Sequence, residues 1–124
     1  MSPAPFETST TELDGVRVLA VRGELDLGTA PDLEPELQAA LAAPESVLID
    51  LTECEFIDST GIALIVRAWQ RIVAEDDGKR RLMIAGHGEQ VGRVLEISGL
   101  SLSIPVHRTR DEGLAALRAG GSGS

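Results

Sequence analysis

The segment Phe56-Ile57-Asp58-Ser59-Thr60-Gly61 brings a hydroxyl, a carboxylate and a glycine together at the expected start of a helix. The free backbone N–H groups and the positive end of the helix dipole stabilise an anion there, so a phosphate on Ser59 would be accommodated. The same segment also fits a simple helix cap, with Ser59 or Asp58 satisfying the first turn at a gain of about 1 kcal/mol. Both interpretations place Ser59 at a helix N-terminus.

Ser59, Asp58 and His87 also supply the nucleophile, acid and base of a serine hydrolase. However, no G-x-S-x-G elbow surrounds Ser59, no oxyanion loop is evident, and His87 stands in a glycine-flanked loop. Hydrolysis is therefore only a remote alternative, and we expect no enzymatic activity.

Metal and cofactor chemistry find little support in the sequence. Two widely separated histidines and the single Cys54 show no metal-ligand spacing, and Gly86-x-Gly88 is too short for a dinucleotide fingerprint. The sequence thus predicts no metal and no cofactor, with Cys54 as a small buried residue.

Hydrophobic periodicity predicts the elements that position Ser59. An antiparallel hairpin turns at Asp14-Gly15, and a first helix carries Leu33, Leu37 and Leu41 on one face. Because Pro35 fits only a first helical turn, we expect Asp32 rather than Thr29 as the cap of that helix. Strands and helices then alternate. A buried central strand Val47–Leu51 is followed by the longest helix, which starts at Ser59, has Trp69 inward and stops at 76–78. After it we expect a strand Arg81–Ala85, a helix Glu89–Ile97 ended by Gly99, an edge strand Ile104–His107 containing Pro105, and a last helix opened by a capping box at 109–112.

This order predicts an α/β fold with a mixed, mainly parallel sheet, about four helices and an N-terminal hairpin. Three loops, Gly23–Gly28, Cys54–Gly61 and Gly86–Glu89, are expected to gather at one edge of the sheet, where parallel strands end. We expect a flexible N-terminus at 1–5, one domain at 6–118 and a flexible Gly/Ser tail at 119–124.

Four segments resemble those of the anti-sigma factor antagonists, a family of the STAS domain type, and occur in the same order. They are Gly23-Glu24-Leu25-Asp26, Leu48-Ile49-Asp50-Leu51, the segment 56–61, and Val94-Leu95-Glu96-Ile97-Ser98-Gly99-Leu100. The resemblance spans roughly Glu12 to Leu117 and implies a single STAS-like domain. It also implies that Ser59 is phosphorylated by an anti-sigma factor with serine kinase activity, that the unphosphorylated protein binds this factor and releases a sigma factor, and that a serine phosphatase restores binding.

The resemblance further implies a partner-binding surface made of Asp26, Asp58, Ser59, Thr60 and Gly61. Turn formation and helix capping explain Asp26 and Asp58 equally well. The chain departs from its relatives at Leu27-Gly28, where they often carry polar residues. The alternative within the same fold is a STAS module that scaffolds a signalling complex or a transporter, with Ser59 never phosphorylated.

Twenty acidic against eleven basic residues give a net charge of −9, which repels nucleic-acid phosphates and anionic membranes and favours basic protein partners. Arg67 and Arg71 on the longest helix are candidates for flanking partner contacts, although a solvated helix face also explains them. With only Phe6, Phe56 and Trp69 as aromatic residues, the core must consist of Leu, Ile, Val and Ala. No apolar run approaches the roughly 20 residues of a membrane span and no signal-like start is present, so we expect a cytoplasmic protein.

Overall fold

In the computed structural model, which describes residues 5–75, 78–86 and 88–121, five strands form one sheet in the order β1-β2-β3-β4-β5. β1 is antiparallel to β2, whereas β2, β3, β4 and β5 run parallel, so the predicted mixed, mainly parallel sheet is confirmed. The elements are β1 Glu7–Leu13, β2 Val16–Leu25, α1 Ala30–Ala42, β3 Ser46–Ile57, α2 Ser59–Val73, β4 Leu82–Ala85, α3 Glu89–Ile97, the 3-10 turn η1 Leu100–Leu102, β5 Val106–His107 and α4 Arg110–Gly121.

The hairpin at the start of the chain turns at Asp14 and Gly15, as predicted. Their φ angles of 53° and 80° are the positive values that a tight turn needs to match the twist of its two strands. Leu13 and Val16 close the hairpin as paired residues.

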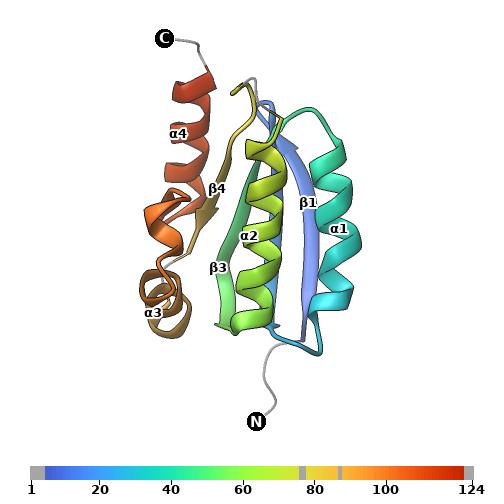
Figure 1. Cartoon of the computed structure of the whole chain (residues 1–124), viewed down its shortest axis with the longest axis vertical. Helices are drawn as coiled ribbons and strands as arrows, with labels where there is room; N and C mark the ends of the chain where they lie inside the picture. The colour runs from blue at the N-terminus through green and yellow to red at the C-terminus, as the bar shows by residue number, and fades with distance from the viewer. Residues whose placement is uncertain (1–4, 76–77, 87, 122–124) are drawn as a thin grey trace.

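Helices cover both faces of the sheet (Figure 1). α1, α2 and α3 pack on one face, and α4 packs on the other against Val16, Val18 and Leu48. The larger cluster is built from Leu, Ile, Val and Ala together with Cys54, and the half-buried Trp69 packs against it. A core poor in aromatic residues is therefore confirmed. No helix in the described ranges is long and apolar enough to cross a membrane.

The second and third strands are longer than predicted. β2 continues to Leu25 and β3 to Ile57, so half of the predicted loop 23–28 and half of the loop 54–61 are strand. The pairing of β2 with β3 runs on to Leu25 and Ile57. The backbone groups of this stretch therefore form sheet hydrogen bonds, although its glutamates are unusual in strands. As predicted, β3 is central in the sheet, but it outruns β4, whose last pair is Asp50 with Ala85.

The prediction for the start of α1 is wrong. Thr29, not Asp32, is the N-cap, and Pro35 lies inside the helix. The helix begins early because the carbonyl of Asp26 accepts from the backbone N–H groups of Thr29 (3.2 Å) and Ala30 (2.8 Å). Pro35 and Pro31 are both exposed, so the Pro31 carbonyl, which loses its helical donor at Pro35, faces solvent rather than the core.

The C-terminal third follows the prediction with three corrections. α3 has the predicted bounds, and Gly99 adopts the left-handed φ of 77° that terminates it. β5, an edge strand as expected, begins only at Val106, after Pro105. The capping box of α4 is half formed, because Thr109 Oγ1 accepts from Glu112 N (3.1 Å) while the Glu112 carboxylate accepts from Arg108 N (3.3 Å) instead of Thr109 N.

The last correction concerns the predicted tail. α4 continues through Gly121, so residues 119–121 of the predicted flexible tail are helical. Residues 1–4 and 122–124, the other ends predicted to be flexible, and 76–77 in the predicted stop of α2 lie outside the described residues.

Candidate functional site

Asp58 caps the N-terminus of α2. Its backbone is extended, and its Oδ1 accepts from the N–H groups of Thr60 (2.9 Å) and Gly61 (3.2 Å). Of the two predicted cap residues, Asp58 therefore takes the role. Ser59 is the first residue of α2 and is exposed.

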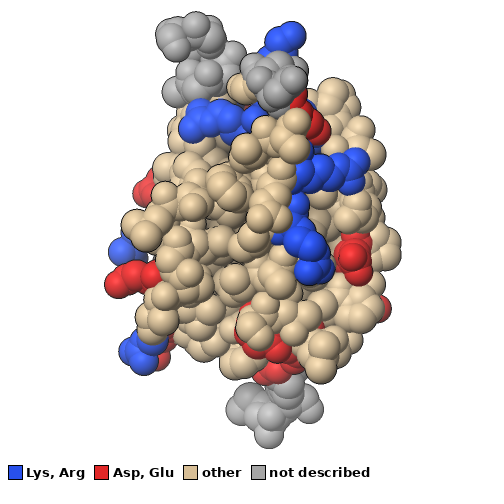
Figure 2. Space-filling view, viewed as in Figure 1, with Lys and Arg blue, Asp and Glu red and all other residues tan. Residues whose placement is uncertain are grey.

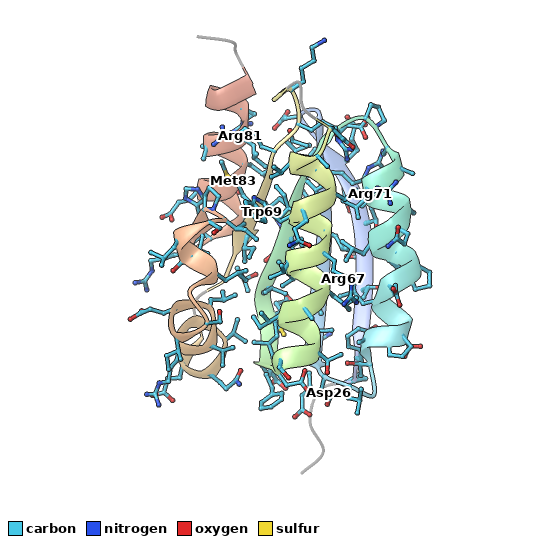
Figure 3. The ribbon with its side chains drawn as sticks, viewed as in Figure 1. Asp26, Arg67, Trp69, Arg71, Arg81 and Met83 are labelled. Atoms are coloured by element: carbon cyan, nitrogen blue, oxygen red, sulfur yellow. The ribbon has the colours of Figure 1, made fainter. Side chains whose placement is uncertain are left out.

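The second oxygen of Asp58 joins this helix start to the turn between β2 and α1. Asp58 Oδ2 accepts from Leu27 N (3.3 Å), and Asp26 Oδ1 accepts from the N–H groups of Gly28 (2.9 Å) and Thr29 (3.1 Å). Figure 3 shows Asp26 at the end of the molecule where α2 begins. The two carboxylates thus do cap a helix and form a turn, and they bring Asp26, Asp58 and Ser59 to one edge.

Gly61 allows α2 to approach the strand ends closely. A Cβ at this position would lie 2.8 Å from Ile57 Cγ1 and 2.8 Å from Leu25 Cγ, closer than such atoms can approach. Since Leu25 and Ile57 are fully buried, neither side chain has space to move aside. The glycine is therefore required by packing, and it determines how closely the start of α2, which carries Ser59, approaches the sheet.

Gln90, in the first turn of α3, holds the last residue of β3. Its Oε1 accepts from Ile57 N (2.9 Å) and its Nε2 donates to Ile57 O (2.9 Å). Sequence reasoning missed this residue, because a polar side chain early in a helix gives no signal of a partner 33 positions earlier. The sequence indicated only that the loops 54–61 and 86–89 lie at the same edge of the sheet, not that Gln90 contacts Ile57.

The surface around Ser59 is acidic and partly apolar. Leu27, two residues after the end of β2, is 74% exposed, and Phe56, next to the end of β3, is 37% exposed. Carboxylates accompany them at Glu24, Asp26, Glu55 and Asp58, and Figure 2 shows red side chains gathered below the start of α2. This edge suits a partner that offers basic side chains and an apolar contact.

Of the alternative hydrolase trio, the structure describes Ser59 and Asp58. His87, the base of the alternative hydrolase trio, lies outside the described residues. The carboxylate of Asp58 accepts hydrogen bonds from the N–H groups of Thr60, Gly61 and Leu27, which is the role of a helix cap.

Cys54 is a packing residue, as predicted. It is 5% exposed, and its Sγ donates to the carbonyl of Phe56 (3.2 Å). Burial raises the pKa of the Cys54 thiol, which keeps it neutral and unreactive. Within the described ranges, no group of three or more His, Cys, Asp and Glu residues has the geometry to hold a metal ion.

Arg67 and Arg71 lie on the side of α2 that faces α1 (Figure 3). Arg71 Nη1 donates to Gln38 Oε1 (2.7 Å) and so ties the two helices together. Arg67 is exposed, but it follows Ser59 by eight residues, a helical rise of about 12 Å. The structure therefore does not bring these arginines to the turn that carries Ser59.

Asp50 is a buried charge that sequence reasoning did not single out. It is 4% exposed, its Oδ2 accepts from Arg110 Nε (2.7 Å), and its Oδ1 accepts from the N–H (2.9 Å) and hydroxyl (2.7 Å) of Thr52. The signal was available, since an aspartate interrupts a run of apolar residues in a central strand. The pair lines an open cavity of about 540 Å³ on the α4 side of the sheet.

Comparison with known proteins gives consistent matches. The model of the STAS domain family matches residues 7–113. The anti-sigma-B factor antagonist of Staphylococcus aureus is 33% identical over 92 residues, which cover 73% of this chain and 82% of that protein. An anti-sigma-F factor antagonist of Mycobacterium tuberculosis is 26% identical over 96% of this chain and 95% of its own. The crystal structure of an anti-sigma factor antagonist from Mycobacterium paratuberculosis superposes with a TM-score of 0.81 and 31% identity, covering 92% of this chain and 95% of the other.

Proposed function

This chain belongs to the STAS domain family, and from that membership we propose that it acts as an anti-sigma factor antagonist controlled by phosphorylation of Ser59. In the proposed cycle the unphosphorylated protein binds an anti-sigma factor that is also a serine kinase, and a sigma factor is released. The observation that carries the proposal is the exposed Ser59 at the first position of α2, next to the cap Asp58. The names of its relatives in Staphylococcus and Mycobacterium support the antagonist role.

The proposed switch is electrostatic and steric. A phosphate adds about 1.5 to 2 negative charges at Ser59. The nearby N–H groups of Thr60 and Gly61, which would otherwise neutralise an anion at a helix start, already bind Asp58. The new charge therefore repels the carboxylates of Asp26 and Asp58 within the same edge. Its desolvation and its bulk also oppose burial against a partner surface that fits the small uncharged hydroxyl.

The role requires no catalytic group in this chain. The partner kinase supplies the phosphoryl transfer, and a serine phosphatase returns the protein to its binding form. Asp26, Asp58, Ser59, Thr60 and Gly61 are the proposed contact residues. Among them, the exposure of Ser59 favours direct contact, while Gly61 contributes through packing.

Phosphopeptide mapping tests the proposal. The protein is incubated with the anti-sigma factor kinase of its own cell and ATP, and we expect one phosphate on Ser59 that is absent from Ser59→Ala. Thr60→Ala is the matched control and should still be phosphorylated. Phosphate that persists on Ser59→Ala would refute the assignment. A wild-type protein that binds the kinase without being phosphorylated would favour the scaffolding alternative.

A further inference from the structure

β3 extends past the end of β4 in the sheet. It continues seven residues beyond Asp50, where its pairing with β4 stops, so from Leu51 onward the side of β3 that faced β4 has no strand partner among the described residues. On the β2 side the ladder continues, because Leu25 pairs with Ile57 and Asp58 N donates to Leu25 O (3.2 Å). The backbone N–H and C=O of Ile57 point to the unpaired side, where a buried residue without partners would be costly.

Gln90 supplies the missing partner. A side-chain amide presents one acceptor and one donor in a plane, as a peptide group of a neighbouring strand does. Its two hydrogen bonds to Ile57, both 2.9 Å, extend the sheet by one residue with a side chain from α3. Ile57 is thereby held between Leu25 on one side and Gln90 on the other.

The held residue precedes the switch directly. Ile57 is followed by the cap Asp58 and then by Ser59, and Gly61 packs on Ile57 from the first turn of α2. Asp58, the one residue between Ile57 and Ser59, is held by hydrogen bonds with Leu25 O, Leu27 N and the first turn of α2. A shift of Ile57 is therefore passed on to Ser59.

We propose that Gln90 is a positioning residue for Ser59, and that its amide clamp on Ile57 sets the geometry in which the kinase phosphorylates the serine. The role rests on the proposed function and adds α3 to the elements that determine it. Phosphoryl transfer depends on placement of the attacking hydroxyl, and displacements near 1 Å cost up to about 100-fold in rate.

Gln90→Met tests this role, because methionine has a similar length and helix propensity but cannot form either hydrogen bond. Amide hydrogen exchange measured by NMR should show Ile57 N–H exchanging at least about tenfold faster than in the wild type. The kcat for phosphorylation by the anti-sigma factor kinase should fall at least about tenfold, while KM changes less than about threefold. Gln70→Met, on the exposed face of α2, is the matched control and should leave both quantities unchanged.

Gln90→Glu provides a second variant, since it keeps the acceptor for Ile57 N but sets a carboxylate against the Ile57 carbonyl. It should lower kcat in the same way. Wild-type kcat in both Gln90 variants, or a lowered melting temperature with unchanged kcat, would overturn the positioning role while leaving the proposed function intact. A wild-type protein that is not phosphorylated would overturn the proposed function and, with it, this role.

Discussion

At the scale of single residues, Asp58 and Ser59 divide two tasks that the sequence left open between them. Asp58 makes the hydrogen bonds that start α2, and Ser59 is left exposed at the first helical position. A residue with no capping duty can change its charge without unfolding the helix. This division is what a switch at Ser59 needs.

Ser59→Asp is expected to weaken binding to the anti-sigma factor at least about tenfold, or about 1.4 kcal/mol. The carboxylate adds charge beside Asp58 at an edge that must be desolvated on binding. The fold should survive, because an acidic residue in the first turn interacts favourably with the helix dipole. Isothermal titration calorimetry against the partner measures the affinity, and thermal melting checks the fold.

Ser59→Asn is the control for this experiment, since it has nearly the size of aspartate without its charge. It should lose less affinity than Ser59→Asp. An unchanged affinity of a folded Ser59→Asp protein would mean that Ser59 does not gate the interface.

Leu27→Ser is expected to lower partner affinity by about tenfold without changing the melting temperature. Leu27 is 74% exposed on the turn joined to Asp58, so its removal leaves the core intact but deletes an apolar contact beside Ser59. Leu102→Ser is the control, because Leu102 is 90% exposed in η1, between α3 and α4 in Figure 1. Equal effects of the two substitutions on affinity would contradict a specific role for Leu27.

At the scale of elements, the extended ends of β2 and β3 carry the site. Their pairing up to Leu25 and Ile57 forms a two-stranded platform beyond β4, and α2 starts directly on it. The position of the site is thus decided by how closely the first turn of α2 approaches this platform. Gly61 is the contact that permits the approach.

Gly61→Ala should destabilise the protein by about 1 to 3 kcal/mol, because its Cβ would overlap Ile57 Cγ1 and Leu25 Cγ. Gly88→Ala is the matched control, since a Cβ there meets no atom within 4 Å and its φ of −52° suits any residue. Urea unfolding of both variants gives the comparison. A Gly61→Ala protein as stable as Gly88→Ala would show that α2 can retreat from the platform without cost.

At the scale of the whole molecule, one ion pair connects the central strand to the last helix. Asp50 in β3 and Arg110 at the start of α4 are 60 positions apart and join across the sheet face opposite α1 and α2. Asp50 is buried, whereas 39% of the Arg110 side chain is exposed, so water screens part of the attraction. The structural requirement lies in Asp50, whose charge needs a partner.

Arg110→Met should lower the free energy of unfolding by about 1 to 3 kcal/mol, because it leaves the buried Asp50 carboxylate with Thr52 alone. Asp50→Asn/Arg110→Met should be more stable than the sum of the single changes predicts, since an amide needs no cation. Chemical denaturation of the four proteins completes the cycle. Additive effects would contradict a direct coupling between β3 and α4.

The sequence by itself determined the alternation of elements, the hairpin at Asp14-Gly15, the central position of β3 and the placement of Ser59 at a helix start. These features follow from local chemistry: apolar periodicity, turn residues and capping residues act over a few neighbours along the chain. The start of α1 was not predicted correctly. Hydrogen bonds from Thr29 N and Ala30 N to the Asp26 carbonyl start the helix before Asp32, although Pro35 favours a position in the first turn.

Only the tertiary structure decided the extensions of β2 and β3, the clamp of Gln90 on Ile57 and the pairing of Asp50 with Arg110. Each joins segments between 31 and 60 positions apart, and each satisfies backbone or charged groups that would otherwise be buried without partners. Such partners are chosen by the packing of the sheet and its helices. A pattern of neighbouring residues therefore does not predict which distant residue will be the partner.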